Sequence, residues 1–359
     1  MRDPRPGEVP DLHEQHQRNE KLVHERPHAA TTMETRRLGR DGPELTRFGL
    51  GLAALGRPAY ITLGHGADFP EGRDVSRMET HSHRVLDRAF VAGIRYLDVA
   101  RSYGRGEHFV RTWIDARGMR TEDVVVGSKW GYRYTGDWRV DARVQEVKDH
   151  SAPMLNAQFA ESTAILGPYL RLYQIHSASI ETGVLEDEQV LTELRRLRDG
   201  GLFLGVTTTG PRQIDTIRHA VEIRFDGGPL FSTIQATWNV LERSAEEGLR
   251  EAHEAGFTVI VKEALANGRL TPRGAEGSAG PLRTVADRLG ASSDAVALAF
   301  VHQQPWADVV LLGAATLPQL DSNLAALGIR LSDEDVDSLE RLRAPAEQYW
   351  AQRSALPWN

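Results

Sequence analysis

The sequence of 359 residues contains no cysteine. Disulfide bridges, thiolate nucleophiles and cysteine-ligated metal sites are therefore excluded, and any chemistry has to come from other side chains. Long apolar runs are also missing, because no stretch reaches the roughly 18 residues that a membrane-spanning helix needs. Residues 1–20 mix acidic and basic side chains without an apolar segment, unlike a signal or transit peptide. We expect a cytoplasmic protein that contacts no membrane.

Positive charge is in deficit, with 43 Lys and Arg against 50 Asp and Glu, which gives a net charge of −7. This balance offers no electrostatic reason to expect nucleic acid as a partner, so a small-molecule ligand is favoured. The composition, 40% hydrophobic and 26% charged, is that of a globular protein with a sizeable core.

Residues 1–34 carry many charges and several prolines but almost no apolar periodicity. We predict a disordered N-terminal extension there, which leaves residues 35–359 as one domain. The extension holds His13, His16, His24 and His28. They have neither cysteine partners nor regular helical spacing, so we predict no metal site.

From residue 35 onward, short apolar runs alternate with stretches that carry apolar residues every three or four positions. The candidate strands are 48–53 (FGLGLA), 96–100 (YLDVA), 124–129 (VVVGSK), 172–176 (LYQIH), 204–208 (LGVTT), 233–237 (TIQAT), 258–263 (TVIVKE) and 309–314 (VVLLGA). Eight such units with continuously apolar strands predict an α/β fold of the (β/α)8 TIM barrel type. A doubly wound open sheet is the alternative, but no GxGxxG follows the first strand.

Local signals refine this prediction. Residues 36–49 (RRLGRDGPELTRFG) indicate a short hairpin around Asp41 and Gly42, which could cap the barrel floor. Gly93, Gly200 and Gly256 end helical patterns, and we expect each to take the left-handed conformation that closes a helix.

In such barrels the working residues lie at the carboxyl ends of the strands. Those ends supply Asp98, Tyr103, Lys129 and His176. A lysine ammonium favours the phenolate and eases proton transfer from tyrosine, while a histidine can orient a carbonyl by a hydrogen bond. The set predicts a general acid that protonates a carbonyl oxygen, with a nicotinamide as the hydride source.

Seven segments in order carry a resemblance over about residues 35–345. They are YLDVARSYGRGEHFV, SKWG, QIHS, GVTTTG, IQATWN, VIVKEALANGRLT and LLGAATLPQLDSNL. The series resembles the aldo-keto reductases, barrels that use an Asp, Tyr, Lys and His tetrad with NAD(P)H to interconvert carbonyls and alcohols. The resemblance assigns these catalytic roles to Asp98, Tyr103, Lys129 and His176, and it implies a small-molecule carbonyl or alcohol substrate.

The resemblance also implies cofactor contacts at the ends of later strands. Thr207 and Thr208 stand where the family has a Ser-Asn pair that binds the nicotinamide carboxamide, and Gln235 matches a family glutamine with that role. Lys262 stands where the family usually has an aromatic residue that stacks on the nicotinamide. A cation there disfavours the oxidised ring, so either Lys262 points elsewhere or the ring is held differently, with help from Trp238 or Trp130.

The last strand is followed by the stretch that, by resemblance, binds the adenosine and its 2′-phosphate. Gly313, Gln319 and Asn323 match the family pattern, whereas Ala314, Ala315 and Gln319 occupy the places where basic residues usually bind the 2′-phosphate. The resemblance still favours NADP(H) over NAD(H), although the missing cations weaken that preference.

Three long segments, 56–74, 130–151 and 346–359, are expected to shape a mixed aromatic and polar substrate pocket. Within the second, we expect Glu146 and His150 to lie on a solvated loop face. Trp130, Trp138 and Trp238 are candidates for either pocket walls or the core.

Two other functions remain open. The first is a Schiff-base lyase or aldolase, because barrels also place reactive lysines at strand ends and Lys262, beside Glu263, or Lys129 could serve. The second is a weakly catalytic NADP(H)-binding sensor that keeps the barrel and cofactor.

Overall fold

Eight parallel strands pair side by side, and the last pairs with the first to close a barrel, in a computed structural model that describes residues 33–359. The barrel strands are β3 (Phe48–Gly51), β4 (Tyr96–Asp98), β5 (Val125–Trp130), β8 (Leu170–Ala178), β9 (Phe203–Thr208), β12 (Thr233–Thr237), β13 (Thr258–Lys262) and β14 (Val309–Leu312). All eight predicted strands are thereby confirmed. The predicted extension, with its four histidines, lies outside the described residues except for its last two positions.

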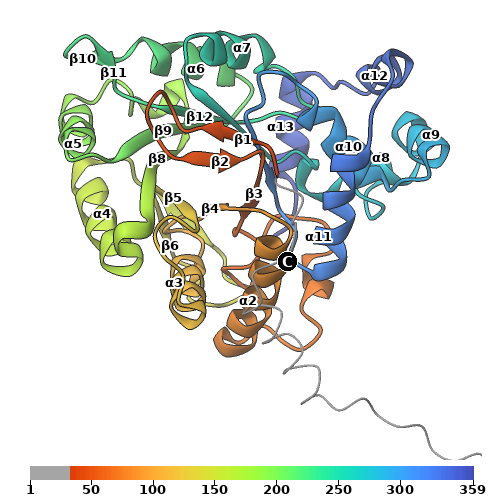
Figure 1. Cartoon of the computed structure of the whole chain (residues 1–359), viewed down its shortest axis with the longest axis horizontal. Coiled ribbons are helices and arrows are strands. Elements are labelled where there is room, and N and C mark those ends of the chain that lie inside the picture. Colours follow the sequence, from red (N-terminus) through yellow and green to blue (C-terminus); the bar gives the residue numbers. More distant parts are fainter. Residues whose placement is uncertain (1–32) are drawn as a thin grey trace, which may run out of the picture.

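Helices surround the strands, as Figure 1 shows. They are α2 (Val75–Val91), α3 (Gly106–Arg117), α4 (Ala152–Leu166), α5 (Glu188–Asp199), α6 (Gln213–Glu222), α7 (Glu246–Glu254), α8 (Ala275–Ser278), α9 (Gly280–Leu289), α10 (Ser293–His302), α11 (Leu317–Leu324), α12 (Asp333–Glu340) and α13 (Ala346–Ser354). The chain is therefore the predicted (β/α)8 barrel. None of the helices within residues 33–359 is both long and apolar enough to cross a membrane.

Helix α5 shows how the local sequence produces these elements. Asp187 caps its first turn by accepting from the backbone N–H of Gln189 at 2.9 Å. Val190, Leu194 and Leu197 recur every three or four residues and are buried against the barrel. Each such burial stabilises the fold by roughly 1.5–3 kcal/mol.

The predicted glycine closures hold at two of three helices. Gly93 and Gly256 have φ of 96° and 89° after α2 and α7. Gly200 does not, since its φ is −76°. Gly201 takes the left-handed conformation instead, with φ of 92°, because α5 extends one residue further than the pattern indicated.

A hairpin of β1 (Thr35–Arg37) and β2 (Glu44–Thr46) lies across the amino-terminal end of the barrel (Figure 1). Its Leu38 and Leu45 are fully buried among barrel residues such as Leu172. Thr258 of β13 donates to the carbonyl of Arg37 at 2.9 Å. The predicted cap on the barrel floor is confirmed.

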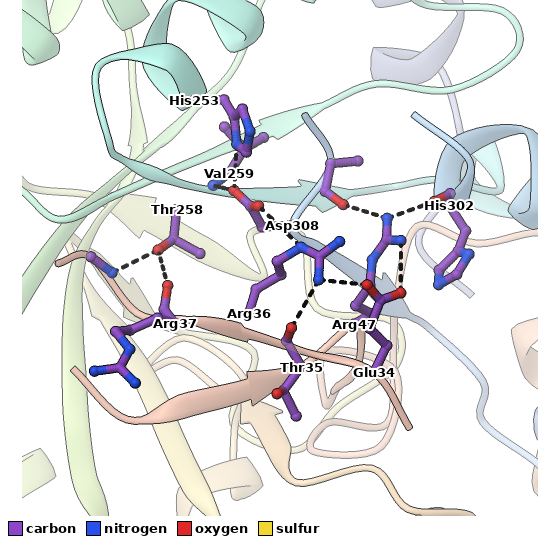
Figure 2. A network of polar contacts seen from close by, with 12 residues as sticks. Glu34, Thr35, Arg36, Arg37, Arg47, His253, Thr258, Val259, His302 and Asp308 are labelled. Carbon is purple, nitrogen blue, oxygen red and sulfur yellow. Dashed lines mark hydrogen bonds and ion pairs between the residues drawn. The ribbon is translucent and has the colours of Figure 1, made fainter. Parts of the chain in front are cut away.

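Polar contacts fix this floor further (Figure 2). Arg47 donates to the carbonyls of His302 and Ala307 at 2.6 and 2.9 Å. Asp308 accepts from the backbone N–H of Val259 at 2.8 Å and contacts His253 at 3.1 Å. The amino-terminal end is thus closed, and an entry for a ligand has to lie at the carboxyl ends of the strands.

The barrel interior is shaped by one large side chain between two glycines. Tyr96 is fully buried. A Cβ on Gly49 would come within 2.7 Å of its ring, and a Cβ on Gly127 within 2.5 Å of its hydroxyl. The glycines therefore leave room for a phenol whose hydroxyl points toward the carboxyl end.

Candidate active site

Asp98 and Lys129 form a buried ion pair at the carboxyl ends of β4 and β5. The lysine ammonium donates to Asp98 Oδ1 and, at 3.0 Å, to the carbonyl of Val99. Burial lowers the pKa of Lys129, and Asp98 opposes that change. The carboxylate therefore keeps an ammonium charged where water cannot reach it.

The second oxygen of Asp98 is held from below by three donors. Tyr96 OH lies 3.2 Å from Oδ2, Gln235 Nε2 lies 3.0 Å away and Gln174 Nε2 lies 3.4 Å away. Charge-assisted hydrogen bonds of this kind fix a carboxylate in place. Tyr96 and Gln174 were absent from the predicted site. Each stands two residues before a predicted site residue, Asp98 or His176, so strand periodicity of two could have placed them on the same face.

Tyr103 lies in the turn after β4, and its hydroxyl is 3.4 Å from the ammonium of Lys129. Burial raises the pKa of Tyr103 well above its ordinary value, and the charge of Asp98 raises it further. The lowered pKa expected beside Lys129 is therefore not found, because burial and Asp98 outweigh the charge of Arg57, which opposes the rise. The phenol therefore keeps its proton at neutral pH.

A second buried carboxylate holds the turn that carries Tyr103. Glu107, 1% exposed, pairs with Arg101 at 2.7 Å and accepts from the hydroxyls of Ser128 and Ser162 at 2.6 and 2.7 Å. These contacts tie the turn to β5 and α4. The hydroxyl of Tyr103 makes only one long contact, at 3.4 Å. The position of the phenol is therefore fixed mainly by the contacts of Glu107, which hold the turn.

His176, at the end of β8, faces Tyr103 with ring centroids 5.5 Å apart in an edge-on arrangement. Burial lowers its pKa well below the ordinary value, and the charges of Lys129 and Lys262 add to this. The imidazole is therefore neutral at pH 7. Its Nδ1 lies 3.5 Å from the hydroxyl of Ser102, which leaves Nε2 as the ring nitrogen available to a ligand.

These groups adjoin a cavity of about 630 Å³ at the carboxyl end of the barrel. Asp98, Tyr103 and His176 line it, whereas Lys129 is 1% exposed and lies behind the wall. The three segments predicted to shape a pocket all contribute, which confirms that prediction. They supply Arg57 and Tyr60, Tyr132 and Glu146, and Arg353 and Trp358.

Arg57 joins two of these segments to the C-terminus. It pairs with Glu146 at 2.7 Å, and its guanidinium lies 4.7 Å from the ring centroid of Trp358 and 5.3 Å from that of Tyr103. The backbone of Asn359 pairs with Tyr60 through hydrogen bonds of 3.2 and 3.3 Å. The C-terminus is therefore part of the cavity wall.

A second charged group faces the cavity from the end of β13. Arg353 of α13 pairs with Glu263 at 2.8 Å, and Lys262 donates to the hydroxyl of Thr237 at 3.1 Å. Although burial opposes it, Arg353 and then Lys262 lower the pKa of Glu263 to about 2. Glu263 and Ser177 have φ of 53° and 57°, a strained conformation that clusters at functional sites.

The predicted cofactor residues divide into two groups. Gln235, Lys262, Gly313, Gln319 and Asn323 line the cavity. Thr207 and Thr208 do not, because both are fully buried. The hydroxyl of Thr207 accepts from the N–H of Ser177 at 2.7 Å, and that of Thr208 donates to Gln213 at 3.2 Å. The next residue, Thr209, lines the cavity instead, so the cavity lining does not support the cofactor contact of this pair, which stays a prediction.

The end of the cavity near α11 offers unused acceptors. Asn323 donates to Asp294 at 2.8 Å, but its Oδ1 is buried without a partner, and so is Oδ1 of Asn267. Buried acceptors normally find donors. Hydroxyl and amine donors of a dinucleotide would satisfy them, so the residues present fit such a cofactor.

Other predictions for this region are corrected. Trp130 and Trp238 are buried away from the cavity, where Trp238 stacks on Phe300 at 5.4 Å, so neither can hold a nicotinamide. Glu146 lines the cavity rather than a solvated face. His150, beyond it, contacts the carbonyl of His176 at 2.9 Å.

Comparisons with known proteins agree with this geometry. The Aldo/keto reductase family model matches residues 62–344. Norsolorinic acid reductase stcV of Emericella nidulans is 28% identical over 71% of this chain and 70% of its own. Aldo-keto reductase YhdN of Bacillus subtilis is 27% identical over 84% and 91%. The structure of aldo-keto reductase AKR11C1 from Bacillus halodurans, in holo form, superposes with a TM-score of 0.65, 21% identity and coverage of 89% and 99%.

Proposed function

The chain belongs to the aldo/keto reductase family of oxidoreductases, and on that premise we propose that it reduces an aldehyde or ketone with NAD(P)H, using Tyr103 as the general acid. One observation supports this most directly. Asp98, Lys129 and Tyr103 are in serial contact, and His176 packs edge-on against the same phenol in the cavity wall.

Proton donation is the task of Tyr103 in this proposal. The raised pKa keeps the phenol protonated in the free protein, so it is ready to give a proton to an oxygen that gains negative charge. Lys129 at 3.4 Å stabilises the phenolate that is left behind. A phenol that holds its proton at neutral pH is in the protonation state that carbonyl reduction requires.

Asp98 and His176 act as positioning groups around this donor. Asp98 holds the ammonium of Lys129 in place and keeps it charged. The neutral imidazole of His176 can donate from Nε2 to the carbonyl oxygen and so orient it toward the phenol.

The family's nicotinamide dinucleotide supplies the hydride for the carbonyl carbon. We propose that Gln235, Gly313, Gln319 and Asn323 hold it, as their cavity positions and the unused acceptor of Asn323 support. Thr209, which lines the cavity, is a further candidate contact. Lys262 also lines the cavity and stays a predicted contact.

The preference between NADP(H) and NAD(H) depends on the groups that would meet the 2′-phosphate. The resemblance favours NADP(H), but every arginine lining the cavity in the described part of the chain already has a carboxylate partner. Arg273, for example, pairs with Asp68 at 2.7 Å, and Asp68 also accepts from Gln319 at 2.8 Å. A 2′-phosphate dianion would meet that carboxylate without a free arginine. We therefore propose that the chain binds NADH at least as well as NADPH.

Purified protein should oxidise NADH or NADPH only when a carbonyl compound is present. Tyr103→Phe should lower kcat by about 10²–10⁴-fold while the cofactor dissociation constant, measured by nicotinamide fluorescence, stays unchanged. Tyr169→Phe removes a phenol hydroxyl that bonds Met119 outside the cavity, and it should keep full activity. Equal activity of the Tyr103 variant and wild type would refute the proposal.

The Schiff-base alternative is supported by one observation, the pKa of Lys262, which burial lowers to about 8. Borohydride should then trap a covalent adduct between substrate and Lys262, and carbonyl-dependent NAD(P)H oxidation should be absent. A cofactor-binding sensor would instead bind NADPH tightly without turnover on any carbonyl compound.

A further inference from the structure

Lys262 differs from the three arginines of the cavity wall. Arg57, Arg273 and Arg353 each have a carboxylate within 2.8 Å. Lys262 has no carboxylate within 4.0 Å among residues 33–359, and its ammonium donates to one neutral group, the hydroxyl of Thr237 at 3.1 Å. Two of its three N–H donors are therefore available to a ligand.

The surroundings of Lys262 make an ammonium without a carboxylate partner unfavourable. Burial lowers its pKa to about 8, and although Glu263 opposes the change, Arg353 and Lys129 add to it. A cation in such a place is stabilised by any anion that enters the cavity. The lowered pKa of Lys262 therefore agrees with the contacts, which show an ammonium without a counter-ion.

Lys262 also shares one chamber with the reacting groups. It pairs in register with Thr237 of β12, two residues beyond Gln235, whose side chain donates to Asp98. Its charge is close enough to help lower the pKa of His176. An anion bound by Lys262 would therefore belong to a molecule lying beside Tyr103 and His176.

The charges divide the cavity into two unlike halves. Around the reacting groups, the pairs of Lys129 with Asp98, Arg57 with Glu146 and Arg353 with Glu263 are each neutral, so Lys262 leaves an excess of one positive charge. The half near α11 has the opposite excess, because Asp68 and Asp294 face a single arginine, Arg273. A negative group on the substrate is favoured only in the first half.

We propose that Lys262 binds the carboxylate of an anionic carbonyl substrate, so that this protein reduces oxo acids or aldehydes that carry a carboxylate. The inference rests on the reductase function proposed above. The hydroxyl of Thr237 already donates to Glu263 at 3.3 Å, so the ligand is bound by the ammonium alone. One ammonium with two available N–H donors suits a single carboxylate, whereas a phosphate dianion calls for the arginine forks that are already occupied here.

The test uses 2-, 3- and 4-carboxybenzaldehyde, each compared with its methyl ester, so that three spacings between carboxylate and carbonyl are covered. Wild type at pH 7 should prefer at least one acid over its ester by about 10- to 100-fold in kcat/KM, the effect of one charge-assisted contact. Lys262→Met should abolish the preference by lowering kcat/KM for the acid about 10- to 100-fold more than for its ester. Lys262→Arg should retain part of it. The preference should also decline above about pH 8, where Lys262 loses its proton.

Two outcomes overturn the proposal. The first is equal reduction of acid and ester by wild type. The second is a Lys262→Met variant that binds NADH more weakly, measured by fluorescence, and reduces acid and ester equally slowly, which would assign Lys262 to the cofactor. If wild type reduces no aldehyde at all, the reductase proposal fails. A binding measurement then still tests the anion site. Benzoate should bind wild type more tightly than benzamide does, and Lys262→Met should remove that difference in affinity.

Discussion

Lys129 and Asp98 form an ion pair in which neither side chain is more than 3% exposed. Such a pair is expensive to desolvate, and replacing both charges by apolar groups often leaves stability unchanged. Removing one partner is different, because it leaves the other charge buried alone. The pair is therefore best explained by the contact that Lys129 makes with Tyr103, which an apolar pair could not provide.

The first prediction concerns this pair. Asp98→Asn should lower the free energy of unfolding by about 3 kcal/mol, because the ammonium of Lys129 loses its counter-ion. The double variant Asp98→Asn, Lys129→Met should recover most of this stability in urea unfolding, yet both variants should lose carbonyl reduction. A double variant as unstable as the sum of its single changes would contradict the coupling.

The second prediction concerns the barrel interior. Gly127→Ala should destabilise the protein by about 1–3 kcal/mol, because the new Cβ would lie 2.5 Å from the hydroxyl of Tyr96. Adding Tyr96→Phe should relieve part of the loss, since the closest atom is then absent while the ring carbons at 3.1 and 3.2 Å remain. Gly228→Ala, whose nearest neighbour is 3.9 Å away, serves as the control and should leave thermal unfolding nearly unchanged.

The third prediction concerns the 2′-phosphate. Asp68→Asn removes a carboxylate that pairs with Arg273 and accepts from Gln319, so a cation becomes free near α11. The affinity for NADPH relative to NADH, titrated by nicotinamide fluorescence, should rise by about tenfold. Glu71→Gln in the same loop removes a charge that pairs with Arg84, and it should leave the ratio unchanged. An unaltered ratio in the Asp68 variant would show that the phosphate lies elsewhere.

The fourth prediction concerns acid stability. Burial lowers the pKa of His302 to about 4, below the value of about 6.5 in an unfolded chain. The neutral histidine therefore contributes stability that is fully present above pH 6.5 and is lost as the pH falls toward 4. His302→Phe should keep the stability at pH 7 and reduce the loss at pH 5 by about 1 kcal/mol, allowing for partial exposure. The check is urea unfolding at both pH values, and an equal loss in variant and wild type would contradict it.

Much of the fold could be predicted because its signals are local. An apolar strand such as the one ending at Asp98 is recognisable from a few residues, and eight of them in alternation with helices leave few topologies. Even the floor hairpin around Asp41 and Gly42 follows from turn chemistry. The misplaced closure at Gly200 marks the limit, since two adjacent glycines cannot be told apart without knowing where packing ends the helix.

The site could be predicted only where the strand order itself brings residues together. Asp98, Lys129 and His176 end strands that are neighbours in the barrel, so their meeting follows from topology. Arg57 and Trp358 could not be paired in this way, because their contact spans almost the whole chain and depends on how the C-terminus packs. The same holds for Asp68, whose partners come from a distant loop, which carries Arg273, and from helix α11, which carries Gln319.

The amino-acid sequence by itself determined the barrel, the absence of thiol chemistry and the residues at the strand ends, because hydrophobic periodicity and residue type act locally. The tertiary structure decided which polar atoms are already satisfied. It buried Thr207 and Thr208 in bonds of their own, raised the pKa of Tyr103 by enclosing it, and left Lys262 without a counter-ion. Desolvation and pairing depend on every neighbour in space, and those neighbours come together only when the chain has folded.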